Sequence, residues 1–114
     1  MPAKLQTVVE TPAYLVAAKG VLSNAERADV ISIVAETPRA GVALGGGIRK
    51  MRIARPGRGK SSGARVVFLF AGEDVPVFLL TVFAKNEKAS LSTRERTALI
   101  STSKQIIEHY RKRK

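Results

Sequence analysis

Residues 45–70 read GGGIRKMRIARPGRGKSSGARVVFLF and set a dense group of cations between two apolar runs. The cations are Arg49, Lys50, Arg52, Arg55, Arg58, Lys60 and Arg65. No Asp or Glu occurs from Thr37 to Gly72, a segment that also contains Arg39. A long acid-free segment with this many cations predicts a surface that binds phosphate groups.

The first half of this stretch has the alternation of a half-buried strand. If residues 48–55 are extended, Lys50 and Arg52 point to one face while Met51 and Ile53 point to the other. The pattern therefore predicts a strand with one apolar face and one cationic face.

The second half is predicted to be a loop followed by a more deeply buried strand. Residues 55–63 combine glycines, a proline and serines with Arg58 and Lys60, which is typical of a turn or loop. Residues 65–70 are almost wholly apolar, as in a strand covered on both faces. Arg65 opens that strand and is its one charged residue.

A phosphate-cradling loop is a competing interpretation of the same residues. Residues 54–61 read A-x-x-x-x-G-K-S, one residue short of G-x-x-x-x-G-K-[ST]. That loop must open a helix, whose N-terminal N–H groups hold the phosphates, whereas here a Val- and Phe-rich strand follows. We therefore favour a basic hairpin loop.

Length, composition and charge limit the number of domains, the kind of partner and the location that can be expected. With 114 residues and 45% hydrophobic content, the chain is expected to form one globular domain over residues 1–114. The net charge of +11 indicates a polyanionic partner, nucleic acid first. Without cysteine there is no disulfide scaffold, and no apolar run approaches the ~20 residues needed to span a membrane, so we expect a cytoplasmic protein.

Helix starts are marked by capping residues. Thr11-Pro12 is expected to cap and open a short helix after a strand at residues 5–9, because proline suits a first helical turn. Ser23 with Glu26, and Ser92 with Glu95, form two capping boxes that open further helices.

A last strand is expected over residues 75–84, after a hairpin turn at residues 71–74. Strict alternation would place Val77, Leu79, Thr81 and Phe83 on one face, in line with Lys85. The full order is β-α-α-β-β-β-α, an α+β fold with an antiparallel meander and the helices packed on one face of the sheet.

These motifs together resemble the RelE/HigB toxins of type II toxin-antitoxin modules. The resemblance is carried by the glycine run, Ile-Arg-Lys-Met-Arg, Gly-x-Gly-Lys-Ser-x-Gly-x-Arg and Ala-Lys-Asn-Glu-Lys, over residues 45–88. It implies a RelE-like fold and a ribosome-dependent endoribonuclease that cuts mRNA. It also implies a cognate antitoxin, expected to be a helix-turn-helix protein from the adjacent gene, with operator DNA bound only through the complex.

The resemblance also implies roles for individual residues. Arg65 matches the arginine that faces the scissile phosphate, while Lys60 and Lys85 match basic positions used as proton acceptor or charge stabiliser. The expected RNA contacts are Arg49, Lys50, Arg52, Arg55, Arg58 and Lys88. The best-known members also carry an active-site tyrosine, which has no obvious counterpart here because Tyr110 lies on a stripe expected to be buried.

The residues themselves are compatible with metal-free RNA cleavage. RNA carries its own nucleophile, the 2′-hydroxyl, and cations can stabilise the developing phosphoryl charge. A lysine among arginines has a lowered pKa, which favours a role as base. The sequence has no carboxylate pair or metal-ligand spacing, so we expect no cofactor. A non-catalytic RNA- or DNA-binding accessory protein remains the alternative, because charge alone would suffice for binding.

Overall fold

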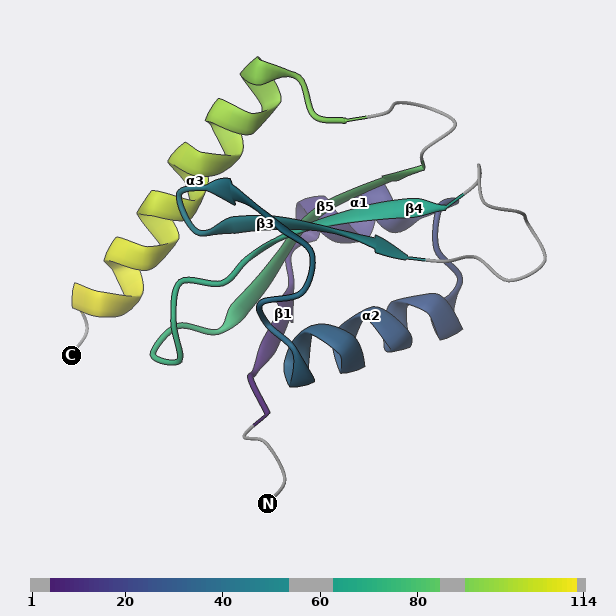
Figure 1. Ribbon diagram of the computed structural model, residues 1–114, viewed down its shortest axis with the longest axis horizontal. Helices are drawn as coiled ribbons and strands as arrows, with labels where there is room; N and C mark the ends of the chain where they lie inside the picture. The colour runs from purple at the N-terminus through teal and green to yellow at the C-terminus, as the bar shows by residue number, and fades with distance from the viewer. Residues whose placement is uncertain (1–4, 54–62, 85–89, 113–114) are drawn as a thin grey trace.

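A computed structural model describes residues 5–53, 63–84 and 90–112, and it confirms the α+β class. Within these residues, five strands form one sheet that is accompanied by three helices (Figure 1). Along the chain these are β1 (Val8–Glu10), α1 (Pro12–Ala18), α2 (Asn24–Glu36), β2 (Val42–Gly45), β3 (Ile48–Ile53), β4 (Ala64–Leu69), β5 (Val77–Ala84) and α3 (Thr93–Lys112). Among the described residues, no helix is both long and apolar enough to cross a bilayer.

The predicted meander forms the centre of the sheet, whose order is β1-β5-β4-β3-β2. Strands β3, β4 and β5 pair antiparallel in succession. β1 adds to the edge beside β5 in the parallel direction, with Val8 opposite Val77. β2 was not predicted as a strand; it pairs with β3 through a tight turn at Gly46 and Gly47, both with positive φ.

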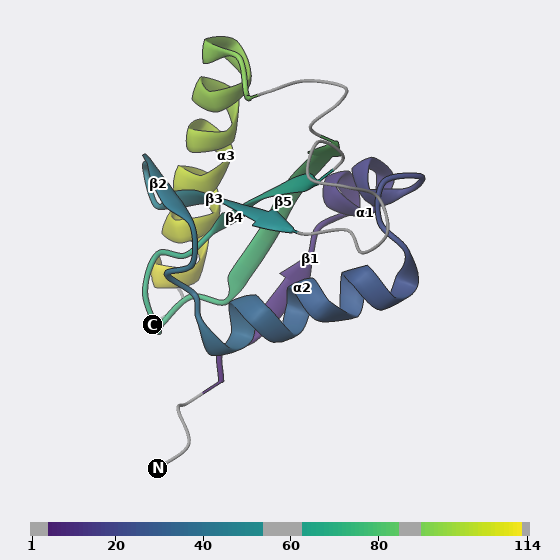
Figure 2. The same ribbon diagram turned by 45° about the vertical axis from the view of Figure 1, so that its right-hand side comes forward.

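The helices cover both faces of the sheet, so the prediction that they pack on one face is wrong. α1 and α2 lie on one face (Figure 2), where Tyr14, Val30 and Val66 belong to one buried apolar cluster. α3 lies on the other, where Ile106 packs against the cluster containing Leu69 and Phe78. The physical reason is that β4 and β5 are apolar on both sides, and each side must be removed from water.

All three predicted helix caps are present. The Thr11 hydroxyl accepts a hydrogen bond from the Tyr14 amide, and Pro12 occupies the first helical position. Ser23 and Glu26 exchange reciprocal bonds of 2.8 and 3.1 Å, as expected of a capping box. The same exchange at the start of α3 uses the side chains of Ser92 and Glu95.

The alternation predicted along β5 is wrong beyond Leu79. Val67 pairs with Thr81 while the next residue, Phe68, pairs with Leu79, so Leu80 is an extra residue in the ladder. Such a bulge shifts the phase of the strand by one residue. Phe83 therefore belongs to the apolar cluster under α3, whereas Leu79 belongs to the cluster under α1 and α2.

Gly41 brings the chain after α2 against β3, beside Lys50. It has φ of 76°, and a Cβ there would lie 2.0 Å from the Lys50 carbonyl oxygen. Gly20 has a similar φ of 81°, yet nothing lies within 4 Å of its Cβ position. The two glycines share the same backbone requirement and differ only in crowding.

We therefore expect Gly41→Ala to destabilise the fold far more than Gly20→Ala. The left-handed backbone alone should cost about 1–2 kcal/mol in either variant. The collision with the β3 backbone should bring the loss for Gly41→Ala to about 3 kcal/mol or more. Urea unfolding of the two variants measures the difference, and equal losses would contradict the close approach of this segment to β3.

Candidate nucleic-acid interface

α3 packs against one face of the sheet. On that face, the side chains change from apolar to cationic over three successive cross-strand rows. The register places Ile48 opposite Leu69, Lys50 opposite Val67, and Arg52 opposite Arg65, with Arg65 also opposite Phe83 of β5. The first row is fully buried beneath α3. The row of Arg52, Arg65 and Phe83, which we call the arginine row, lies at the other end of the sheet.

Within the arginine row, Arg65 has a hydrogen-bond donor that is not satisfied. Its side chain is partly buried, and its NH1 atom has no hydrogen-bond partner among the described residues. A buried charged N–H group without an acceptor is costly, and an anion oxygen would satisfy it. Arg52, directly opposite, is exposed and adds a second positive charge.

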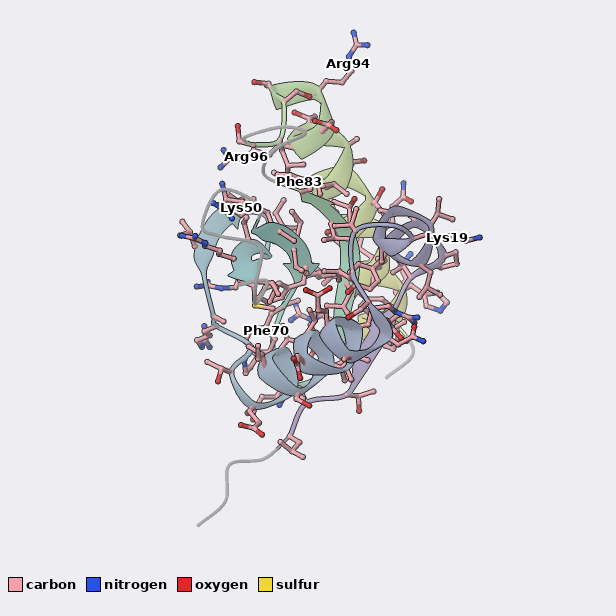
Figure 3. All side chains as sticks on the ribbon, turned by 90° about the vertical axis from the view of Figure 1, so that its right-hand side faces the viewer. Lys19, Lys50, Phe70, Phe83, Arg94 and Arg96 are labelled. Carbon is pink, nitrogen blue, oxygen red and sulfur yellow. The ribbon has the colours of Figure 1, made fainter. Side chains whose placement is uncertain are left out.

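Lys50 lies one row closer to α3, on the same face as Arg52. It is half-buried, and Figure 3 shows it on the same side of the molecule as Phe83 and Arg96. These side chains come from β3, β5 and the first turn of α3. The cationic face of β3 therefore extends from the arginine row by one row toward the part of the sheet that α3 covers.

Arg49 has a different role from its neighbours on β3. Its guanidinium donates hydrogen bonds to the carbonyl oxygens of Arg39, Ala40 and Gly41, at 2.7, 3.0 and 3.1 Å. Strand alternation places it on the opposite face from Lys50 and Arg52. These bonds fasten the segment between α2 and β2 to the sheet, and the RNA contact expected of Arg49 stays a prediction.

Two residues on this side of the sheet were missed by sequence reasoning. Arg96 donates from Nε to the carbonyl oxygen of Leu44 at 2.8 Å, and its NH2 group contacts the same oxygen. Leu44 is an extra residue in the β2–β3 ladder, which frees its carbonyl for this bond. Phe83 was placed on the other face because the bulge at Leu80 leaves no signal in the sequence.

Several predicted site residues lie outside the described residues. These are the catalytic candidates Lys60 and Lys85 and the RNA-binding candidates Arg55, Arg58 and Lys88. In sequence, residues 54–62 connect β3 to Gly63, and residues 85–89 follow β5. In the sequence, both segments are therefore joined to the strand ends that carry the arginine row.

Tyr110 and His109 are placed away from the arginine row. The Tyr110 ring packs edge-on against Phe78 at 5.6 Å, near the start of β5, and His109 packs against Tyr110 at 5.8 Å. Arg65 pairs with Phe83 near the end of that strand. Within the described part of the chain, no group of three His, Cys, Asp or Glu residues could hold a metal ion.

Comparisons with known proteins identify the family and the fold of this chain. The sequence model of a family described as the RelE toxin of the RelE/RelB toxin-antitoxin system matches residues 16–113. A solved structure of the E. coli toxin RelE, a mutant with two arginines changed to alanine in the free state, superposes with a TM-score of 0.55. The two chains are 25% identical, and the match covers 84% of this chain and 98% of that one.

We expect Arg49→Lys to lower stability, because an ammonium group cannot reproduce a fork of bonds to three carbonyls. The free energy of unfolding should fall by about 1–3 kcal/mol. The matched control is Arg94→Lys, which changes an exposed cation on the first turn of α3 and should stay within about 0.5 kcal/mol. If the Arg49→Lys protein were as stable as the wild type, the three hydrogen bonds would not be needed for stability. Contact with RNA would then be the main role expected of Arg49.

Proposed function

The chain belongs to the RelE toxin family, and on this premise we propose that it is a ribosome-dependent endoribonuclease that inhibits translation by cutting mRNA. The observation that carries the proposal is the arginine row. A partly buried Arg65 has an unsatisfied nitrogen, with a second arginine directly across the strand pair. That arrangement suits a phosphodiester, whose negative charge must be held while its bonds change.

Cleavage requires little chemistry from the protein because the substrate supplies the nucleophile. The 2′-oxygen attacks phosphorus, its proton passes to a base, and the P–O5′ bond breaks as the 5′-oxygen gains a proton. The products are a 2′,3′-cyclic phosphate on the upstream fragment and a 5′-hydroxyl on the downstream one. Arg65 would hold the phosphoryl oxygens as their charge grows, a contribution of about 10²- to 10³-fold in rate for one such donor.

The proton transfers are assigned to lysines. Lys60 and Lys85 remain the candidates, on the basis of the resemblance, while Lys50 is the described lysine on the face of the arginine row. No metal is needed in this scheme, because guanidinium and ammonium groups neutralise the phosphoryl charge. We propose that Lys50 and Arg52 contact the RNA backbone beside the cut.

Membership of a toxin-antitoxin family implies an antitoxin partner. We propose that it is encoded by the adjacent gene, that it contains a helix-turn-helix domain, and that operator DNA is bound only by the complex. An acidic segment covering the cationic end of the sheet would offset the net charge of +11. Since the substrate would be ribosome-bound mRNA, the site of action is the cytoplasm.

Arg65→Ala is expected to abolish growth inhibition while leaving the fold intact. The side chain belongs to neither apolar cluster, so stability should change by about 1 kcal/mol or less. Growth on induction, with and without co-expression of the adjacent gene, measures toxicity, and thermal unfolding checks the fold. Arg94→Ala is the control for loss of one charge and should stay toxic; a folded, fully toxic Arg65→Ala protein would remove Arg65 from the site.

A substrate lacking the nucleophile tests the reaction itself. Replacing the nucleotide 5′ to the cut with its 2′-deoxy form keeps every phosphate contact, so binding should survive and cutting should stop. Cleavage of programmed ribosome complexes, analysed for end groups, provides the measurement. Efficient cutting of the deoxy substrate would mean that water or a side chain attacks, whereas binding without any cutting of the normal substrate would favour a non-catalytic RNA-binding protein.

A further inference from the structure

The outward surface of α1 is apolar. Its sequence, PAYLVAA, contains no charged residue, and its inward side chains are Tyr14 and Ala18, both buried. The outward side chains include Val16, which is 76% exposed, and Leu15, which is 39% exposed. The exposed residues, which we call the α1 patch, are Pro12, Ala13, Leu15 and Val16. They lie three or four positions apart or are neighbours in sequence, so they form one continuous surface, and such a surface is typical of an interaction site.

A cavity of about 320 Å³ extends the α1 patch toward α2. Leu15, Ala18 and Leu22 give it an apolar lining, and Lys19 lies at its border. Its volume is that of a small ligand pocket. The α1 patch therefore offers exposed apolar surface together with a hollow that can receive an apolar side chain.

The layer that carries the α1 patch has a charge opposite to that of the whole chain. Residues 5–36, the segment of β1, α1 and α2, contain four carboxylates and two cations, a net charge of −2 in a chain of net charge +11. One of the two cations, Arg27, is already paired with Glu10 at 3.0 Å. A polyanion such as RNA is not attracted to this layer, so the partner that fits the α1 patch is a protein.

The α1 patch and the arginine row belong to opposite faces of the sheet. Ala64 and Val66, the neighbours of Arg65 on β4, belong to the apolar cluster beneath α1 and α2. Arg65 itself therefore points to the other face. Lys19, which follows α1, and Lys50 of β3 project on opposite sides of the molecule (Figure 3). A protein bound to the α1 patch does not, by that contact, displace a ligand of Arg65.

We propose that the α1 patch anchors the cognate antitoxin through an apolar segment that carries few acidic side chains. The choice of occupant rests on the toxin function proposed above. This contact is separate from an acidic segment over the cationic end of the sheet, whose attraction salt would screen. The anchor persists in salt, because it buries apolar surface. It also keeps the acidic segment at a high effective concentration near the arginine row.

The test measures binding of the purified antitoxin from the adjacent gene to the intact toxin. Calorimetry gives the Kd at low salt and at about 1 M salt, where attraction between exposed charges is screened. Val16→Gln replaces an exposed apolar side chain with an uncharged one that suits a helix, so thermal unfolding should not change. The Kd should rise about tenfold at both salt concentrations, as for the loss of one buried aliphatic side chain.

Val42→Gln is the matched control. It makes the same change at a valine that is 63% exposed, on β2, which lies at the opposite edge of the sheet from β1. This variant should keep the wild-type Kd. Arg65→Ala should raise the Kd at low salt only, because it removes a charge on the other face and leaves the α1 patch intact.

Four results would overturn the anchor: no binding of the antitoxin to the wild-type toxin, unchanged binding to Val16→Gln, equal weakening by Val42→Gln, or loss of wild-type binding at about 1 M salt. If Val16→Gln instead converted a dimer of the free toxin into a monomer, the occupant would be a second copy of this chain and the antitoxin assignment would fall.

Toxicity and cleavage assays distinguish failure of the anchor from failure of the proposed function. Val16→Gln alone should inhibit growth and cut mRNA as the wild type does. If both proteins cut mRNA and bind the antitoxin equally well, the ribonuclease stands and the anchor falls. If antitoxin binding depends on Val16 yet the wild-type protein cuts no RNA, the anchor stands and the ribonuclease assignment falls.

Discussion

The structure depends on one constraint: the central strands β4 and β5 are apolar on both faces and must be covered on both. α1 and α2 bury one face, so α3 is required on the other. The apolar side chains of α3 pack over the row of Ile48 and Leu69. The arginine row lies on the same face, at the far end of these strands. The same packing of α3 therefore buries the apolar rows and leaves the arginine row beyond the covered apolar row.

Cations also fasten α3 to the sheet, so the charge of +11 is not devoted to ligands alone. Near its start, Arg96 binds the Leu44 carbonyl that the bulge exposes. In its last turn, Arg111 pairs with Asp74 at 2.9 Å and donates to the Ala71 carbonyl. The hydrogen bond to Asp74 raises the pKa of Arg111, which favours its charged form. Exposed bonds of this kind are individually weak, but together they fix the direction of α3 across the sheet.

Local rules predicted the parts of the fold that local chemistry decides. The capping residues Thr11, Ser23 and Ser92 start helices where expected, and the antiparallel meander follows from short turns between apolar strands. Arg65 was likewise placed at the opening of its strand. The parallel pairing of β1 with β5 could not be predicted, because it depends on contacts between segments far apart in the sequence. The bulges at Leu44 and Leu80 were missed because an extra residue in a ladder is fixed by the partner strand and not by its own side chain.

Three buried polar atoms in the described residues lack a hydrogen-bond partner, and they differ in charge and surroundings. The Tyr14 hydroxyl lies in the core under α1, where burial, reinforced by Glu10, raises its pKa to about 12. It stays neutral, and its cost is limited to one unmade bond of about 1–3 kcal/mol. Ser103 is likewise a neutral hydroxyl, fully buried on α3. The nitrogen of Arg65 that lacks a partner differs because it carries charge and because Arg65 lies across from a second arginine. Of the three unmade bonds, the one at Arg65 is therefore the one that the proposed phosphodiester ligand would complete.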